Sequence, residues 1–217
     1  MAKARLILLG ILAALATSAM AAASASAHEF IVGGTGIKEV LKGTFTSGTS
    51  TLKGEVLSKK IAIVSSLDTG TFSIGPAGTS TFEVSFTKDT ISEVGSKGEL
   101  IALPKCVVPT ITFSGTDALL ELKSKLLDTF TGSAPPLFVK IKVNNLSETE
   151  TCALKGTYEA DGTANAFLPS VGTPAKTHKI EFNPIEESQS LTLGGKPATF
   201  ESIETLALND GAEWSAK

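Results

Sequence analysis

The sequence predicts an all-β protein, either an antiparallel sandwich or a barrel-like domain, preceded by a signal helix that is cleaved. Three observations predict this class. Beyond residue 27 the chain repeats short alternating runs rich in Thr, Val, Ile and Phe. Gly-containing turns separate these runs at spacings of about 8–12 residues, which is typical of sandwiches and barrels and not of parallel α/β sheets. The two cysteines form one even pair, which suits a disulfide in an exported chain.

Residues 1–27 have the three parts of an export signal. Lys3 and Arg5 supply the positively charged start. Residues 6–16, LILLGILAALA, follow as an apolar run that is shorter than the roughly 20 residues of a membrane span. A stretch of small residues then ends in ASA at 25–27, the A-x-A pattern that signal peptidase accepts.

Cleavage after Ala27 leaves a mature domain of residues 28–217, which we expect to be secreted and to contain no membrane span. The alternative is an uncleaved N-terminal anchor. Removing Lys3 and Arg5 leaves 17 of the 19 basic residues beside 22 acidic ones, a net charge of −5. Arg5 is the only arginine, the side chain best suited to read phosphates and guanine edges. We therefore expect no nucleic-acid partner.

The first half of the mature chain consists of short alternating runs. We expect strands at 51–57, 60–65, 71–74 and 81–86. A cluster of turn residues, Gly-Pro-Ala-Gly at 75–78, separates the last two. In the run at 81–86, alternation places Phe82, Val84 and Phe86 on one face, which we expect to face the core.

The segment 117–130, DALLELKSKLLDTF, fits two structures. As a helix it would begin at Asp117 as the cap and carry an apolar stripe. That stripe comprises Leu119, Leu122 and Leu126. As a strand it would direct the other set of apolar residues inward. That set comprises Ala118, Leu120, Leu122 and Leu126. Intrinsic propensity favours the helix and the surrounding β pattern favours the strand; we predict the strand.

A sub-boundary is expected near 131–136, where the chain reads TGSAPP. Strands are expected on its far side at 137–143 and 152–160, and later at 179–182, 189–193, 198–204 and near Trp214. A disulfide between Cys106 and Cys152 would span this boundary, so we expect one continuous domain or two stapled lobes. A metal site is the alternative use of the cysteines, but the C-x-x-C spacing is missing.

Several of these segments occur together in a recognisable order. The chain reads AHEF at 27–30, LFVKI at 137–141, CALKGTY at 152–158 and GTA at 162–164. Together they resemble an uncharacterised, paralogue-rich family of secreted actinobacterial β-rich proteins. The resemblance covers most of the mature chain and implies export and a β-rich fold. It implies no catalytic residue.

Candidate chemistry is sparse. His178 is the only histidine after His28, and we interpret it as the exposed start of a strand, since the G-x-S-x-G pattern of a nucleophile elbow is missing. A group of acids comprises Glu181, Glu186 and Glu187. We interpret it as an exposed loop, not as a glycosidase pair. Trp214 is the ligand-contact candidate, because a Trp near the C-terminus can be partly exposed; packing under the last strand is the default interpretation. We expect no metal and no cofactor.

Two functions remain open from the sequence. The first is a secreted, non-enzymatic β-domain with a structural, surface or interaction role and a cell-wall or extracellular protein as partner. The second is a secreted hydrolase or carbohydrate-binding accessory protein, which rests on compartment and fold class alone. A pocket that joins His178 to a serine and an acid would favour the second. An exposed His178 would favour the first.

Overall fold

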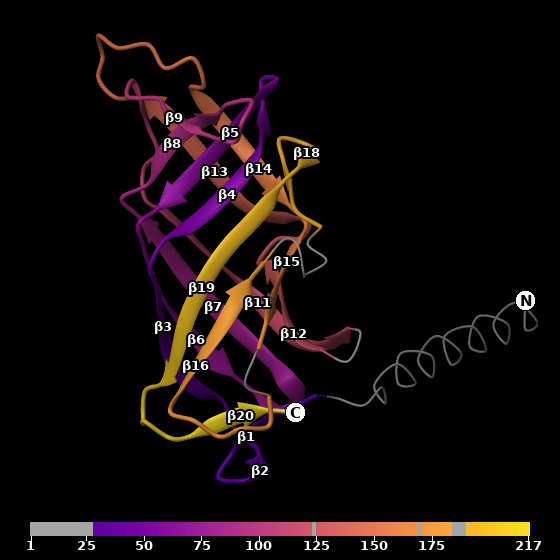
Figure 1. Ribbon diagram of the computed structural model, residues 1–217. Coiled ribbons are helices and arrows are strands. Elements are labelled where there is room, and N and C mark those ends of the chain that lie inside the picture. The colour runs from indigo at the N-terminus through magenta and orange to yellow at the C-terminus, as the bar shows by residue number, and fades with distance from the viewer. Residues whose placement is uncertain (1–27, 123–124, 169–170, 184–189) are drawn as a thin grey trace, which may run out of the picture.

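The protein is built from antiparallel β-strands (Figure 1). The computed structural model describes residues 28–122, 125–168, 171–183 and 190–217. Within these ranges the regular structure is β-strand apart from one 3-10 turn, η2 (Pro76–Gly78), which confirms the predicted all-β class. The expected signal peptide, residues 1–27, lies outside the described residues. Nowhere in the described chain is there a helix with the length and apolar character that crossing a membrane requires.

Eight strands form a sheet that closes on itself, and we call it the closed sheet. Its strands, in order, are β16 (Thr177–Phe182), β15 (Thr163–Phe167), β12 (Lys125–Gly132), β11 (Ile111–Leu122), β7 (Thr79–Thr87), β6 (Leu67–Ile74), β3 (Leu41–Ser47) and β19 (Thr199–Leu208). Pairing of β16 with β19, from Thr177 opposite Ala207 to Phe182 opposite Ser202, completes the ring. A closed sheet of eight strands leaves an interior that side chains or one small ligand can fill.

Two further sheets lie beyond one end of the closed sheet, and we call them the upper sheets (Figure 1). The first continues from β19 through β4 (Ser50–Val56), β5 (Lys59–Ser65), β8 (Thr90–Val94) and β9 (Leu100–Ala102). The second consists of β10 (Cys106–Val107), β13 (Leu137–Asn145), β14 (Gly156–Asp161), β17 (Thr192–Leu193) and β18 (Lys196–Pro197). Their apolar residues join those of the closed sheet in one hydrophobic cluster.

Three long arms of chain, residues 41–56, 59–74 and 79–94, run through both regions. In the first arm β3 pairs with β6 inside the closed sheet, whereas β4 pairs with β5 above it. β6 pairs in turn with β7, and β5 pairs with β8. The closed sheet and the first upper sheet are therefore two halves of the same hairpins.

The opposite end of the closed sheet is covered by a three-stranded base sheet of β2 (Thr35–Gly36), β1 (Phe30–Val32) and β20 (Trp214–Ala216). β1 and β20 come from the two ends of the described chain and pair antiparallel. Backbone hydrogen bonds between Glu29 and Lys217, at 2.9 and 3.1 Å, extend this pairing. Phe30 and Trp214 are buried and carry their rings inward from the base sheet.

Glycine opposite phenylalanine makes room for rings inside the closed sheet. Gly43 lies opposite Phe72, and Gly70 lies opposite Phe45, across the same β3–β6 pair. A Cβ on Gly43 would overlap the Phe72 ring and the carbonyl oxygen of Ala207. Glycine in a strand often marks such a close approach. The ring of each phenylalanine thus lies on the bare backbone of the neighbouring strand.

The described residues of segment 117–130 are β structure, which confirms the strand prediction, but they form parts of two strands. β11 and β12 pair antiparallel from Gly115 opposite Gly132 to Leu122 opposite Lys125. The predicted inward face is wrong in β11, where the Leu120 side chain is 49% exposed and Asp117 is buried, whereas Leu126 in β12 is buried as predicted. Ser80 supplies the reason, because its hydroxyl donates a hydrogen bond to the buried Asp117 carboxyl.

The disulfide between Cys106 and Cys152 is present, with a Cα–Cα distance of 4.9 Å. It lies in the second upper sheet, where it joins β10 to the turn that precedes β14. The strand expected at 152–160 begins only at Gly156, because Lys155 N donates to Cys152 O in a turn. Residues 133–136 connect β12 of the closed sheet to β13 of the upper sheet.

Candidate functional site

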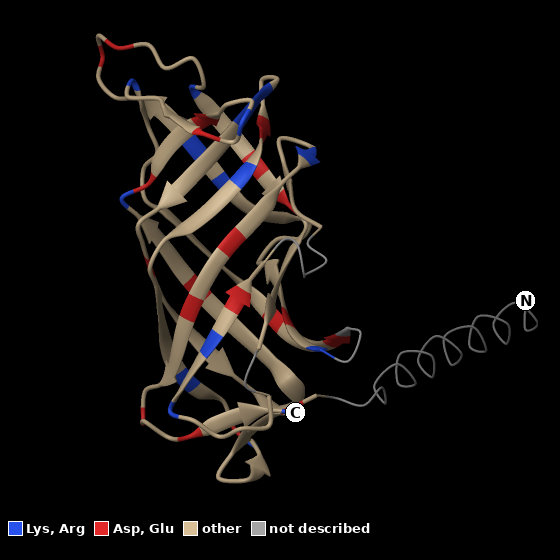
Figure 2. Ribbon diagram, in the orientation of Figure 1, with Lys and Arg blue, Asp and Glu red and all other residues tan. Residues whose placement is uncertain are grey.

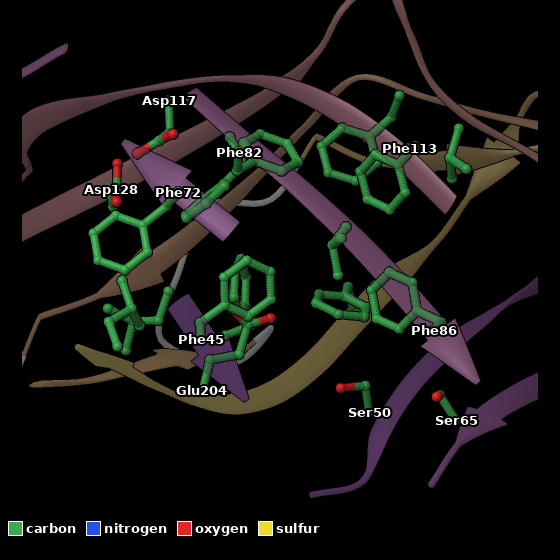
Figure 3. A pocket seen from close by; sticks show the side chains of 18 of the residues that line it. Phe45, Ser50, Ser65, Phe72, Phe82, Phe86, Phe113, Asp117, Asp128 and Glu204 are labelled. Carbon is green, nitrogen blue, oxygen red and sulfur yellow. The ribbon is translucent and has the colours of Figure 1, made fainter. Parts of the chain in front are cut away.

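An internal cavity of about 90 Å³ lies within the closed sheet and extends to its junction with the upper sheets (Figure 3). Apolar side chains make most of its wall. The polar side chains that line it are Ser50, Ser65, Ser80, Asp89, Asp117, Asp128 and Glu204. Figure 3 shows Asp117 and Asp128 at one end of the cavity, while Ser50 and Ser65 lie beyond Phe86 at the other.

Six phenylalanine rings form an unbroken belt around this cavity, and we call it the aromatic belt. Each ring contacts the next, with centroid distances from 5.1 to 5.9 Å. In order they are Phe82, Phe113, Phe86, Phe200, Phe182 and Phe130, which then returns to Phe82. Most of the contacts are edge to face, the geometry that aromatic quadrupoles favour. Every ring of the belt also lines the cavity.

Asp117 and Asp128 form a buried pair, which we call the acid pair. Asp117 lies opposite Phe130, and Asp128 lies opposite Leu119, so the two carboxyls are diagonal neighbours on the inner face of β11 and β12. They hydrogen-bond to each other. Ser80 on β7 donates a further hydrogen bond to Asp117 Oδ2. No N–H or hydroxyl group of the described residues donates to Asp117 Oδ1 or Asp128 Oδ1.

Two carboxyls can hydrogen-bond only when one of them holds a proton. Burial raises the pKa of the Asp128 carboxyl well above its ordinary value, and the negative charge of Asp117 raises it further. Burial also raises the pKa of Asp117, while its hydrogen bonds from Asp128 and Ser80 lower it. The two acids therefore share one proton.

Two other acids that line the cavity have raised pKa values. Burial raises the pKa of Glu204 to about 8, with added repulsion from Asp68 and Asp117. Burial raises the pKa of the half-buried Asp89 to about 6. Glu204 lies on β19 with Ser202 and Leu206 on the same inward face. The cavity is thus bordered by carboxyls whose surroundings favour their neutral forms.

A cluster of serines holds a further acid, Asp68, beside the cavity. Asp68 on β6 is fully buried and lies opposite Ser47 of β3. Its Oδ2 accepts hydrogen bonds from Ser47, at 2.7 Å, and from Ser50. Ser50 in turn lies 2.7 Å from the hydroxyl of Ser202 on β19. The hydroxyls of Ser47 on β3 and Ser50 on β4 therefore satisfy this carboxyl oxygen without any basic side chain.

Basic residues are distributed differently from the buried acids of the closed sheet. Figure 2 shows lysines concentrated around the upper sheets, whereas acidic positions recur along strands of the closed sheet. The surface of the upper sheets carries ion pairs with N–O distances from 2.7 to 3.3 Å. They are Lys53–Glu201, Lys59–Glu93, Lys105–Glu150 and Lys140–Glu159. The described residues that line the cavity include four acids and no Lys, Arg or His.

Two residues singled out in the sequence, Trp214 and His178, are buried. Trp214 is 1% exposed, as its default interpretation of packing under the last strand predicts, and its ring lies at the base of the cavity against Phe30 and Phe72. His178 is 3% exposed, which corrects its interpretation as the exposed start of a strand. The physical reason is the base sheet, which covers both side chains. Nε2 of His178 lies 2.5 Å from the carbonyl oxygen of Trp214, so this nitrogen donates a hydrogen.

The acidic loop expected around residues 183–187 is described only in part. Glu181 is half-buried on β16. Glu186 and Glu187 lie outside the described residues. Within the part of the chain that the structure describes, three or more His, Cys, Asp or Glu side chains nowhere come together in a way that could hold a metal ion.

Sequence reasoning missed the acids that line the cavity, although alternation carried a signal. Asp117 has the same parity along its strand as Phe113, and Asp128 has the same parity as Phe130. An acid in phase with core phenylalanines is an inward-facing acid.

Comparison with known proteins gives no relationship: no family model matches the chain, and no curated protein or solved structure matches it.

Proposed function

We propose that this protein is a secreted, non-enzymatic β-domain that works by binding, and that the interior of the closed sheet holds one small, largely apolar molecule. The observation that carries the proposal is the cavity bounded by the aromatic belt. Concave sites with mostly apolar walls and a few polar groups are the usual form of small-molecule sites. An eight-stranded closed sheet is also the size that can enclose one small ligand.

The geometry of His178 supports a binding role over the alternative of a secreted hydrolase. A general base must accept a proton from its nucleophile, with a free lone pair within hydrogen-bond reach. His178 is 3% exposed, packs its ring edge to face against Trp214 at 4.3 Å between centroids, and is not among the described residues that line the cavity, so it has no access to a substrate there. The acid pair also lies inside a cavity that is too small for a sugar ring with its neighbours.

The aromatic residues disfavour the other alternative, a carbohydrate-binding accessory protein. Sugar binding generally uses an exposed aromatic face, and the Trp214 ring is buried. The hydroxyl of Tyr158 donates to Leu154 O at 2.8 Å, which holds that ring against the turn that precedes β14. A cell-wall or extracellular protein remains the partner we propose for the outer surface, and a cell-wall pull-down with residues 28–217 tests it.

Xenon binding followed by ¹²⁹Xe NMR tests the interior site directly, because xenon enters apolar cavities of small size. We expect a bound-xenon shift with the wild-type protein. Ala160→Leu adds side-chain volume at a lining position and should abolish the shift, whereas Ala153→Leu, on the exposed surface, should leave it unchanged. A wild-type protein that takes up no xenon would contradict the proposed function.

A further inference from the structure

We infer that the molecule held in the cavity is a small organic cation, an ammonium group on a compact hydrocarbon body. The inference rests on the proposed interior site and names the chemical class of its ligand. Three features of the described residues carry it: a buried pair of carboxyls held only by one serine and by each other, rings that enclose the space, and a wall without basic residues.

The first feature is the acid pair. Asp117 and Asp128 are 6% and 4% exposed, and no N–H or hydroxyl group of the described residues donates to Oδ1 of either one. Both side chains line the cavity. Buried polar atoms are almost always hydrogen-bonded, so these two oxygens are satisfied either by the proton that the pair shares or by a donor that enters the cavity. An ammonium group has up to three N–H donors and no acceptor, which matches two acceptors.

The second feature is the aromatic belt. The face of a phenylalanine ring carries partial negative charge and attracts cations within about 6 Å of its centroid. Phe130 lies directly opposite Asp117, and Phe82 lies two residues beyond Ser80, so the belt begins at the acid pair. A cation held by the carboxyls would therefore have its hydrocarbon body among the rings.

The third feature is the charge of the residues that line the cavity. Four acids border the cavity, and the lining residues include no Lys, Arg or His to balance them. An isolated buried carboxylate is costly unless it is paired, so the site is satisfied either by protons or by a cation. A ligand that brings a positive charge replaces the shared proton of the acid pair and lets both carboxyls ionise.

The volume of the cavity and the chemistry of its wall narrow the class of ligand. The cavity of about 90 Å³ is smaller than the roughly 150 Å³ cavity that accommodates benzene. Ca²⁺ and Mg²⁺ need about six oxygen ligands around them, whereas rings make most of this wall. A small alkylammonium such as ethylammonium, with half as many heavy atoms as benzene, fits the volume, and its ordinary pKa near 10.5, like that of lysine, keeps it charged at pH 7.

Isothermal titration calorimetry with ethylammonium, and with ethanol as the neutral molecule of the same shape, tests the inference. We expect the wild-type protein to bind the ammonium at least tenfold more tightly than the alcohol at pH 7. Asp128→Asn and Asp117→Asn keep the side-chain shape and remove a charge, so the fold should persist and the preference for the ammonium should fall at least tenfold. The matched control Asp210→Asn changes an exposed turn acid and should retain it.

The possible outcomes distinguish the proposal of a cation from the proposal of an interior site. Equal binding of alcohol and ammonium, unchanged in both Asn variants, would overturn the cation while the interior site stands. Absence of binding by either probe, together with absence of bound xenon, would overturn both. A preference for the ammonium that survives in Asp128→Asn and in Asp117→Asn would place the cation elsewhere on the protein and reject this site.

Discussion

The closed sheet and the upper sheets share the same three arms of chain but accommodate their acids in opposite ways. In the upper sheets, acids such as Glu201 and Glu93 lie on the surface and pair with lysines. In the closed sheet, Asp68, Asp117 and Asp128 lie inside and are held by serine hydroxyls or by each other. A hydroxyl partner satisfies a carboxyl without adding a second charge, whereas lysine would bring its own desolvation cost.

The two regions are also stabilised differently. A disulfide fastens the second upper sheet, whereas ring packing on bare glycine backbone, as at Gly43 and Phe72, fixes the closed sheet. We therefore expect that breaking the disulfide destabilises the upper sheets, and that adding one methyl group to a glycine destabilises the closed sheet.

The largest expected effect comes from reducing the disulfide. The two cysteines are 46 positions apart, and releasing a loop of this length lowers the free energy of unfolding by about 4 kcal/mol in the chain-entropy model. Urea denaturation with and without a thiol reductant measures this loss. The Cys106→Ser, Cys152→Ser double variant is the control, since reductant should not change it. A wild-type midpoint that does not move would show that the bridge contributes nothing to the upper sheets.

Gly43→Ala should destabilise the closed sheet by about 3 kcal/mol. The new methyl group overlaps the Phe72 ring and the backbone oxygen of Ala207, and overpacking of this kind costs roughly 1–3 kcal/mol. Gly48→Ala is the matched control, because nothing lies within 4 Å of its Cβ position. Thermal unfolding of both variants gives the comparison. Equal melting temperatures would mean that Phe72 does not rest on Gly43.

The buried Glu204 makes stability depend on pH. Its pKa is raised from an ordinary 4.5 to about 8, so the folded protein keeps a proton that the unfolded chain releases above pH 4.5. The contribution to the free energy of unfolding is complete below pH 4.5 and is lost as the pH rises to about 8. The slope should reach about 1.4 kcal/mol per pH unit for this proton.

Urea titrations between pH 4.5 and 8 measure this slope. Glu204→Gln should reduce the slope by up to the contribution of one proton, about 1.4 kcal/mol per pH unit, because an amide does not titrate. Glu201→Gln, three residues earlier on the same strand and exposed beside Lys53, should leave it unchanged. A slope that is the same in the wild type and in Glu204→Gln would contradict the buried acid as its source.

The smallest effect is expected at the surface of the upper sheets. Lys53 and Glu201 are 2.9 Å apart, and their side chains are 44% and 42% exposed. Exposed ion pairs contribute about 0.2–1 kcal/mol, and salt screens them. A double-mutant cycle with Lys53→Met and Glu201→Gln at low and high salt measures the coupling. A coupling well above 1 kcal/mol would mean that charged groups contribute alike to stability in the upper sheets and in the closed sheet, which would contradict the comparison.

Alternation predicted the strands whose inward residues are apolar. The runs at 81–86 and 137–143 lie within β7 and β13, and Phe82, Val84 and Phe86 are buried as expected. The reason is local, because a period of two in apolar residues is enough to define a strand with one buried face.

Features that depend on residues far apart along the chain could not be predicted from the sequence. The inward position of Asp117 depends on Ser80, 37 residues away, and on Asp128 of the next strand. The pairing of β11 with β12 was missed because the sequence between them, Lys-Ser, lacks the Gly or Asn that two-residue hairpin turns prefer. The burial of Trp214 depends on β1, which comes from the other end of the chain.

The pairing of β1 with β20 also dictates an order of events during synthesis. The closed sheet lacks β19 until residues 199–208 are made, and its base is incomplete until residues 214–216 follow. Enclosure of the cavity, and any capture of a molecule within it, therefore requires both of these segments.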